Sequence, residues 1–291
     1  MKVSIVIPVY NGEKTIARCL DSITRQRGVD QEVIVIDGDS TDGTLRILDR
    51  YKDSIAYLES SPDDGQSHAI NKGLRAATGD ILCWLCCDDT FADRALPKVV
   101  QAFQSRRDVD VVSGACMRVF ENGQEMLRQV GPKSWQRVPY NNEFDQPAMF
   151  WSRRLYERVG DVDESLKLAM DWDYWNRFKR EMRDCALLES VLAYYYFSET
   201  NKTSMNPDGH LKETQKVVAK YCPFGGLTEK LYSYLYNNFD LKGFYDKEYQ
   251  LSESDKNLFY QYLRFAKSLF GNDIVDMYNW NWISKMERAK A

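Results

Sequence analysis

The sequence has few histidines, no long apolar run and no repeated pair of Cys-x-x-Cys motifs. Its 291 residues include two histidines and seven cysteines, so a zinc finger or zinc ribbon is not expected. An odd number of cysteines without metal-binding spacing is typical of a reduced, intracellular protein. About 18 consecutive apolar residues are needed to cross a membrane, and no window of the sequence supplies them. The apolar run before Pro8 is too short for a secretory signal.

Neither sign of charge is in large excess. Lys and Arg total 39, Asp and Glu total 43, and the net charge is −4. Nucleic-acid-binding domains are usually strongly basic, so we do not expect nucleic acid as the main partner. The sequence also lacks GxGxxG after its first apolar segment and lacks GxxxxGK[ST] throughout. A phosphate site built on either glycine-rich loop is therefore not expected.

Apolar, β-branched segments alternate with segments of helical spacing over the first 90 residues. Continuous apolar runs of this kind are typical of strands buried on both faces of a sheet. The alternation predicts an α/β fold with a mostly parallel, doubly wound, Rossmann-like sheet flanked by helices. The expected strands cover residues 3–9, 32–36, 55–59 and 80–85, and the expected helices cover 13–26, 44–51 and 65–78.

The second half of the chain follows a different pattern. Asn122-Gly123 lies between two apolar stretches and predicts a β-hairpin, and residues 171–181 predict a helix with acids at its start. After about residue 205 apolar and aromatic residues recur at helical spacing. We therefore expect an α/β domain over residues 1–205 and a helical C-terminal appendage over residues 206–291.

Acidic residues follow three of the four expected strands. Asp37 and Asp39 follow the second strand, Asp64 follows the third, and Asp88 and Asp89 follow the fourth. In doubly wound sheets, ligands bind beyond the carboxyl ends of the strands. One or two carboxylates are the usual protein ligands of Mg²⁺. Asp88 and Asp89 therefore predict a site for a hard divalent cation, with a cap of the following turn as the alternative for Asp89.

Two cysteines, Cys86 and Cys87, directly precede these acids. Neighbouring side chains at the end of a strand point to opposite faces. A zinc clamp made of both sulfurs is therefore not expected, and the pair is better interpreted as small apolar residues that pack near the strand end.

Five segments of the sequence occur in a characteristic order. They are VSIVIPVYNG (3–12), IVIDGDSTDGT (34–44), NKGLRAATGDILCWLCCDD (71–89), QPAMFWSRRLYERVGDVDESL (146–166) and AMDWDYWNRF (169–178). Together they resemble the motifs of the family 2 glycosyltransferases, which have the GT-A fold, over about residues 1–204. The resemblance implies an inverting transfer of a sugar from a nucleotide diphosphate sugar, assisted by Mg²⁺ or Mn²⁺. Such a cation stabilises the charge that develops on the leaving diphosphate.

The resemblance also assigns the metal-binding motif. The family has Asp-x-Asp at this point, and the matching residues are Cys86, Cys87 and Asp88, followed by Asp89. The first acid is thus replaced by Cys86. This leaves Asp88 and Asp89 to bind the metal and the ribose-phosphate part of the donor.

Further residues are assigned to the nucleotide by the same resemblance. Asp37 matches an acid that hydrogen-bonds the nucleobase, whereas Asp39 is also explained by a turn that leads into a helix. For Tyr10 the alternative to nucleotide binding is packing in the core. For Lys72 the alternative is a solvated position on its helix. The full predicted set is Pro8, Tyr10, Asn11, Asp37, Asp39, Asp64, Gln66, Lys72 and Asp88.

The acceptor side of the site is assigned in the same way. Asp171 matches the general base that takes the proton from the acceptor hydroxyl. Asp173 lies about 200° around the helix from it, and either binds acceptor hydroxyls or pairs with Arg177 at i+4. Gln146 and Trp172 are expected to line the acceptor pocket.

The loop after the last strand departs from the family. Relatives often have a histidine there, and this sequence has Glu199 or one of its neighbours at the matching position. A supporting metal ligand is therefore not expected, and Lys202 is an alternative contact for the phosphate.

The expected donor is a nucleotide sugar of the UDP or dTDP type, and the expected acceptor is a saccharide, a lipid-linked molecule or a protein. We expect a cytoplasmic enzyme of polysaccharide or glycoconjugate biosynthesis. Its C-terminal helices are expected to pack on the catalytic domain or to form a homodimer, with peripheral contact to the inner face of the membrane as the alternative. Two rival functions remain open at this point, a nucleotidyltransferase and a degenerate, glycosyltransferase-like binding module.

Overall fold

The structure is a computed structural model that describes residues 1–139, 141–198 and 201–222 together with residues 230 and 261. The described chain divides into two units. The first consists of Met1–Ser134 and Phe144–Pro207, and the second contains Trp135–Glu143 and the chain from Asp208 on. The boundary expected after residue 205 stays a prediction. Apart from residues 230 and 261, the appendage expected over residues 206–291 lies outside the described residues beyond position 222.

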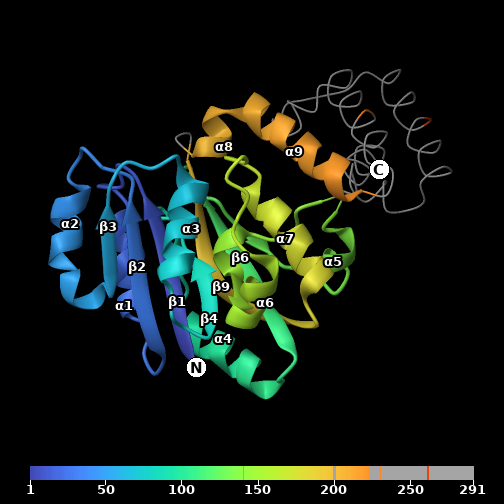
Figure 1. The fold of residues 1–291 in the computed structure, drawn as a ribbon, viewed down its shortest axis with the longest axis horizontal. Helices are drawn as coiled ribbons and strands as arrows, with labels where there is room; N and C mark the ends of the chain where they lie inside the picture. Colours follow the sequence, from blue (N-terminus) through green and yellow to red (C-terminus); the bar gives the residue numbers. More distant parts are fainter. Residues whose placement is uncertain (140, 199–200, 223–229, 231–260, 262–291) are drawn as a thin grey trace. The chain divides into compact units, whose positions relative to one another are not determined.

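Four parallel strands form the first half of the sheet in the first unit. They are β1 (Lys2–Val9), β2 (Asp30–Asp37), β3 (Tyr57–Ser60) and β4 (Ile81–Trp84), and their order is β3-β2-β1-β4. Residues 3–9 of β1 and 32–37 of β2 are buried without interruption, because helices cover both faces of the sheet. Figure 1 shows α3 in front of these strands. The predicted doubly wound α/β architecture is confirmed.

Three helices connect these strands, namely α1 (Ile16–Thr24), α2 (Thr44–Arg50) and α3 (Gln66–Ala76). Helix α1 buries Ile16, Cys19, Leu20 and Ile23. This spacing of three to four residues places the four side chains on one helical stripe that faces the core. Since each helix follows a strand, its N-terminal end lies at the carboxyl edge of the sheet, where the acidic residues gather.

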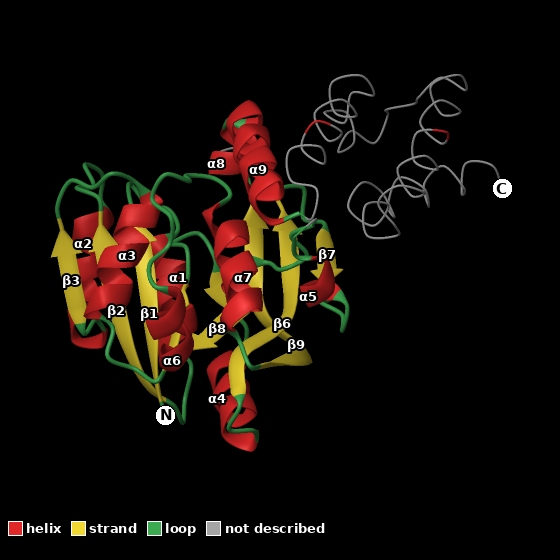
Figure 2. Cartoon of the chain, turned by 45° about the vertical axis from the view of Figure 1, so that its right-hand side comes forward, coloured by secondary structure: helices red, strands yellow, loops and turns green. Residues whose placement is uncertain are grey.

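The second half of the sheet is mixed. Strand β8 (Met149–Ser152) is antiparallel to β4 and to β6 (Val109–Phe120), and β6 is parallel to β9 (Asp184–Phe197). The predicted hairpin is present, since β6 pairs with β7 (Glu125–Arg128) across a turn at Gly123, whose φ is 76°. Figure 2 shows β6 and β9 side by side next to α7. This half of the sheet brings residues beyond position 190 next to the loop after β4.

Two elements were not expected from the sequence, whereas the helix predicted over residues 171–181 is present as α7. The short strand β5 (Thr90–Phe91) pairs with β9, and α4 (Ala95–Ser105) follows it. The remaining elements are the 3₁₀ turns Lys52–Ser54 and Gln146–Ala148 and the helices α5 (Ser134–Arg137), α6 (Arg153–Val159), α7 (Met170–Glu181), α8 (Lys202–Met205) and α9 (Pro207–Tyr221). Among the described residues, none of the helices has the length and apolar character needed to cross a bilayer.

An aromatic cluster fixes helix α7 on the sheet. The rings of Trp84 in β4 and Trp175 in α7 are stacked with centroids 5.6 Å apart, and Trp151 in β8 lies edge-on to Trp84 at 5.2 Å. All three indoles are buried. Aromatic packing of this kind stabilises beyond the apolar area that it buries. It therefore holds the first turn of α7, which carries Asp171, in a fixed position relative to the end of β4.

Candidate functional site

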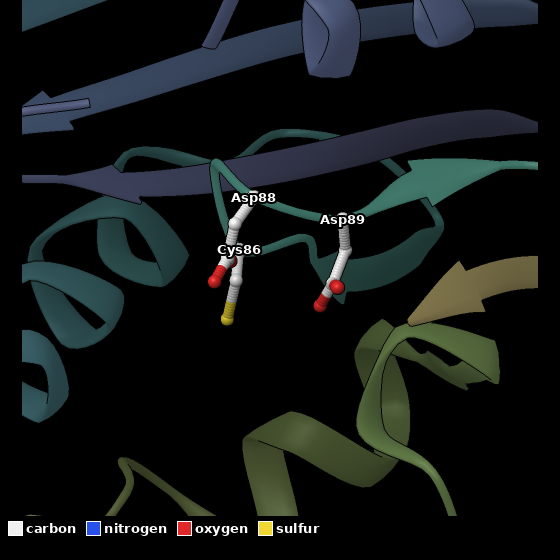
Figure 3. Close-up of side chains that lie close together, drawn as sticks. All are labelled: Cys86, Asp88 and Asp89. Atoms are coloured by element: carbon white, nitrogen blue, oxygen red, sulfur yellow. The ribbon is translucent and has the colours of Figure 1, made fainter. Parts of the chain in front are cut away.

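A tight turn after β4 brings three potential metal ligands together. The amide of Asp89 donates a hydrogen bond of 3.0 Å to the carbonyl oxygen of Cys86, which closes a four-residue turn. The Cys86 sulfur and one carboxylate oxygen each of Asp88 and Asp89 all lie within 4.8 Å of one another. Figure 3 shows the three side chains directed to the same side of this loop. We call Cys86, Asp88 and Asp89 the ligand cluster.

The two carboxylates of the ligand cluster differ in burial, and Asp88 is partly exposed. Asp89 is 1% exposed, and its Oδ1 accepts a hydrogen bond of 3.1 Å from the amide of Tyr196 in β9. Burial, and after it the charge of Asp88, raises the pKa of Asp89 well above its usual value. Burial also raises the pKa of Asp88, and the charges of Arg18 and Lys202 oppose that rise. A buried carboxylate with a second acid beside it is costly without a compensating cation.

The two cysteines lie on different sides of the turn. The Cys86 sulfur accepts a hydrogen bond of 3.1 Å from Gln66 Nε2 and lies 3.6 Å from Gln146 Oε1. The Cys87 sulfur instead lies 3.9 Å from Thr15 Oγ1. Only Cys86 therefore belongs to the ligand cluster, which agrees with the expectation that the two sulfurs do not form one clamp.

Asp37 is held at the end of β2 by serine residues. It is fully buried, and its carboxylate accepts hydrogen bonds from the Ser40 amide at 3.0 Å, the Ser40 hydroxyl at 2.5 Å and the Ser60 hydroxyl at 2.6 Å. The Ser40 hydroxyl oxygen also accepts the Asn11 amide at 2.7 Å. Asp37 and Asn11 are thus brought together through one hydroxyl. Tyr10, next to Asn11, is 64% exposed at this edge of the sheet.

The other residues predicted for the nucleotide differ in exposure and contacts. Pro8 is buried in β1, whereas Asp39 is exposed and has a φ of 66°. The Asp64 side chain is 87% exposed. Gln66 contacts the ligand cluster through Cys86. Lys72 forms an ion pair of 2.7 Å with Glu59, so its ammonium group points toward β3 in this structure.

The acceptor-side residues are arranged around α7. Asp171 lies in the first turn and is partly exposed, and its Oδ1 accepts the Trp172 amide at 2.7 Å. Asp173 is fully buried and pairs with Arg177 at 3.0 Å, which was one of the two expectations for it. Trp172 is 6% exposed. Gln146 donates a hydrogen bond of 2.7 Å to the carbonyl oxygen of Trp84.

The charges of acids on both sides of the site act on the phenol of Tyr195 in β9. Burial raises the pKa of Tyr195, and the charges of Asp89, Cys86, Asp171 and Asp88 add to that rise in this order. A single hydroxyl therefore lies within electrostatic reach of the ligand cluster and of Asp171. Within the described part of the chain, no hydrogen-bond partner of this hydroxyl is found. Its position follows from the pairing of β9 with β6 and β5, which local sequence patterns do not contain.

Three basic or amide groups near the ligand cluster complete the site. Arg18 in α1 donates a hydrogen bond of 2.8 Å to the carbonyl oxygen of Asp88, and its guanidinium lies 3.6 Å from the centre of the Tyr196 ring. Asn201 Nδ2 lies 3.3 Å from Asp88 Oδ2. Lys202 lies 3.3 Å from Gln66 Oε1. Lys202, in the loop after the last strand, was predicted from the sequence as a contact for the phosphate. Nothing in the sequence indicated Arg18 or Asn201. Glu199 lies outside the described residues.

Comparison with known families gives the class of this protein. The family described as "Glycosyl transferase family 2" matches residues 4–182. The chain therefore belongs to glycosyl transferase family 2 and is a glycosyltransferase, as its motifs indicated. The nucleotidyltransferase alternative has no support from this match.

Curated relatives agree with this assignment. A PGL/p-HBAD biosynthesis glycosyltransferase of Mycobacterium tuberculosis is 29% identical over 175 residues, which are 59% of this chain and 67% of that protein. An uncharacterized glycosyltransferase of Rickettsia prowazekii is 29% identical over 191 residues, which are 61% of this chain and 58% of that protein.

Solved structures confirm the GT-A fold. S. aureus TarS 1–349 in complex with UDP-GlcNAc has a TM-score of 0.64 at 18% identity, and covers 95% of this chain and 84% of its own. The mannosyltransferase PcManGT from Pyrobaculum calidifontis, in complex with GDP-Man and Mn²⁺, has a TM-score of 0.53 at 20% identity. The second covers 94% of this chain and 73% of its own.

Proposed function

We propose that this glycosyltransferase moves a sugar from a nucleotide diphosphate sugar to an acceptor hydroxyl, with inversion at the anomeric carbon and with the aid of a divalent cation. The observation that carries the proposal is the ligand cluster at the end of β4, whose ligand atoms lie within 4.8 Å of one another. Asp171 lies in the first turn of α7, and α7 packs on β4 through the stacked rings of Trp175 and Trp84. A leaving diphosphate and an attacking hydroxyl must meet at one carbon atom, and this arrangement suits both requirements.

The donor is a UDP- or dTDP-sugar in this proposal. Support for the UDP type comes from TarS, which was solved with UDP and with UDP-GlcNAc. PcManGT was solved with GDP-Man and supports only the broader class of nucleotide sugars. The base and ribose lie at the carboxyl ends of β1, β2 and β4. The residues proposed to bind them are Pro8, Tyr10, Asn11, Asp37, Asp39, Asp64, Gln66, Lys72 and Asp88.

The ligand cluster fits a divalent cation. Its donor set contains two carboxylates. Within the described residues, the buried carboxylate of Asp89 accepts one hydrogen bond, from the amide of Tyr196. Asp88 and Asp89 would hold Mg²⁺ or Mn²⁺. When bound, the cation supplies positive charge to the leaving diphosphate. Arg18 and Lys202 lie beside Asp88 and add positive charge on the same side of the site.

Asp171 acts as the general base in this proposal. A single displacement with inversion needs one carboxylate to take the proton of the acceptor hydroxyl while the hydroxyl oxygen attacks. Asp171 is partly exposed, whereas Asp173 is buried in its pair with Arg177. We therefore propose that the Asp171 carboxylate takes the proton of the acceptor hydroxyl. Gln146, Trp172 and Asp173 are proposed to shape the acceptor pocket.

The acceptor is a saccharide, a lipid-linked molecule or a protein, in a pathway of polysaccharide or glycoconjugate assembly. One relative takes its name from PGL/p-HBAD biosynthesis, which supports the glycoconjugate class. We propose a cytoplasmic site of action, with the C-terminal region in a homodimer or at the inner membrane face.

Isothermal titration with nucleoside diphosphates and nucleotide sugars tests this proposal. We expect one nucleotide to bind with Mn²⁺, to bind far less well with EDTA, and to lose its metal dependence in Asp88→Ala. Asp171→Ala should bind the nucleotide as the unmodified chain does. Absence of binding for every nucleotide, by folded protein with or without metal, would instead indicate a degenerate binding module. For an active donor and acceptor pair, the anomeric configuration of the product by NMR tests the inversion.

A further inference from the structure

We propose that the sulfur of Cys86 is a third ligand of the cation, so that the site binds borderline or soft divalent ions such as Co²⁺ and Cd²⁺ in preference to Mg²⁺. This inference rests on the proposed metal site of the glycosyltransferase. In this proposal Cys86 replaces, as a metal ligand, the first acid of the Asp-x-Asp motif. The sequence alone favoured oxygen ligands, and the structure adds one sulfur to two carboxylates.

The distances within the ligand cluster support one shared ion. Metal–sulfur bonds are about 2.3 Å and metal–oxygen bonds about 2.0–2.2 Å, so two ligand atoms on one ion are at most about 4.5 Å apart. The Cys86 sulfur and the Asp88 and Asp89 oxygens lie within 4.8 Å of one another. Small rotations about the side-chain bonds are enough to bring all three into ligand distance. Figure 3 shows that the sulfur and both carboxylates already face the same side of the turn.

One neighbour of Cys86 suits a metal-bound thiolate. Gln66 Nε2 donates a hydrogen bond of 3.1 Å to the sulfur, and groups that orient a ligand in this way strengthen metal sites. Binding of the ion breaks the S–H bond and releases one proton to solvent, while the sulfur electron pair forms the bond to the metal. Gln146 Oε1, 3.6 Å away, loses its weak thiol donor in this step and keeps its own amide bond to Trp84.

The identity of the ligand atoms determines the choice of metal. Mg²⁺ prefers six oxygen ligands and binds thiolates poorly, whereas thiolates favour softer ions. One sulfur in the cluster therefore weakens Mg²⁺ relative to Co²⁺, Cd²⁺ and Zn²⁺. Cys87 is a matched control, because its sulfur is adjacent in sequence but lies toward Thr15.

Titration of the full chain with Co²⁺ tests the inference without any need for turnover. A cobalt–thiolate bond gives an intense near-ultraviolet charge-transfer band, which an all-oxygen site lacks. We expect the band in the unmodified chain and in Cys87→Ser, and we expect it to disappear in Cys86→Ser. The affinity for Co²⁺ and Cd²⁺ should fall about tenfold or more in Cys86→Ser. Loss of a group that only hydrogen-bonds a metal ligand already lowers metal affinity by about this factor. Cys86→Asp should also lack the band and should bind Mg²⁺ more tightly than the unmodified chain.

The outcomes separate this inference from the proposed function. If UDP binds in a metal-dependent way but Co²⁺ gives no charge-transfer band, the sulfur ligand is wrong and the donor site stands. A band that persists in Cys86→Ser, or that is lost in Cys87→Ser, also contradicts the role of Cys86. If Co²⁺ does not bind at all, both the sulfur ligand and the proposed cation site are wrong. Far-ultraviolet circular dichroism shows that each variant is folded, and Cys86→Asp provides the comparison if Cys86→Ser is not.

Discussion

The amide of Tyr196 in β9 donates a hydrogen bond of 3.1 Å to the carboxylate of Asp89 in the loop after β4. These residues are 107 positions apart in the chain. Strand β9 thus completes a site whose acids are carried by the Rossmann-like first half. The hydrogen bond orients Asp89 and leaves most of the cost of its burial uncompensated, which a bound cation would reduce.

Asp89→Asn should weaken the binding of divalent cations and stabilise the metal-free fold. The amide keeps an oxygen that accepts the Tyr196 hydrogen bond, but it removes a buried charge next to Asp88. We expect about a tenfold or greater loss of Mn²⁺ affinity, together with a higher melting temperature in EDTA than for the unmodified chain. Calorimetric titration and thermal unfolding measure the two effects. Asp93→Asn is the control, since Asp93 is exposed and lies outside the ligand cluster, and it should change neither quantity.

Asp171→Asn should separate chemistry from donor binding. Loss of a general base lowers turnover by about 10²–10⁴-fold, and the affinity for the nucleoside diphosphate should stay unchanged. Asp173→Asn is the contrasting variant, because it leaves Arg177 without its buried partner. Breaking such a pair costs about 3 kcal/mol of folding stability. If Asp171→Asn retains full turnover while the protein is folded, Asp171 is not the base.

Sequence reasoning succeeded where local patterns determine the result. Continuous apolar runs predicted β1, β2 and β4, and the turn residues Asn122-Gly123 predicted the hairpin of β6 and β7. The turn after β4 placed Asp88 and Asp89 together because they are neighbours in the chain. This information was sufficient for the parallel half of the sheet, for the hairpin and for the proximity of Asp88 and Asp89.

The remaining features depend on contacts between distant segments. Strand β5 has two residues and exists because β9 pairs with it, so its own sequence carries no signal. Tyr195 and Arg18 reach the site through sheet pairing and helix packing, 106 and 70 positions from Asp89 and Asp88 respectively by their numbers in the sequence. Single-sequence patterns extend over a few residues, and therefore contain no information on such pairs.

Glu32 in β2 should make stability depend on pH in the acid range. Burial opposes its ionisation, but hydrogen bonds from Lys2, Ser4 and Thr78 outweigh burial and lower the pKa of Glu32 to about 2. Because this pKa lies below that of the unfolded chain, the stabilisation is complete above the unfolded value. It is lost as the pH falls toward about 2. It amounts to roughly 3 kcal/mol at neutral pH.

Glu32→Gln tests this contribution. We expect the variant to be less stable than the unmodified chain at pH 7, and the difference to shrink steadily as the pH falls below the unfolded pKa of a glutamate. Urea unfolding at a series of pH values measures it. Asp30→Asn in the same strand is a suitable control, since Asp30 is exposed, and it should show no such trend. A difference between Glu32→Gln and the unmodified chain that is constant with pH would contradict the assignment.

Lys202→Ala should weaken the binding of nucleoside diphosphates more than Lys72→Ala does. Lys202 contacts Gln66 and lowers the pKa of Asp88 against the effect of burial, whereas Lys72 is paired with Glu59. The Lys202 side chain is exposed, so salt screens its charge. We expect about a fivefold loss of affinity at low salt, and a smaller loss at high salt. Equal effects of the two substitutions would show that the Lys72 pair with Glu59 opens when the donor binds.

Tyr195→Phe should lower turnover and leave the fold intact. The substitution removes only the hydroxyl, on which the charges of Asp89, Asp171 and Asp88 act, and the phenyl ring keeps its contact with Phe197 at 4.3 Å. A hydrogen bond from this hydroxyl to a charged group of the bound substrate would contribute about 1.5–3 kcal/mol, so we expect a loss in kcat of roughly 10- to 100-fold. The melting temperature should change little.

Tyr196→Phe is the matched control for the loss of a phenol at the adjacent position in β9. Its ring still lies against Arg18, and its amide still binds Asp89. We therefore expect kcat close to that of the unmodified enzyme. If both substitutions reduce kcat alike, the loss results from a disturbance of strand β9 and not from removal of the Tyr195 hydroxyl. If Tyr195→Phe raises KM for the acceptor and leaves kcat unchanged, the hydroxyl binds the acceptor in the ground state and does not act in the transfer itself.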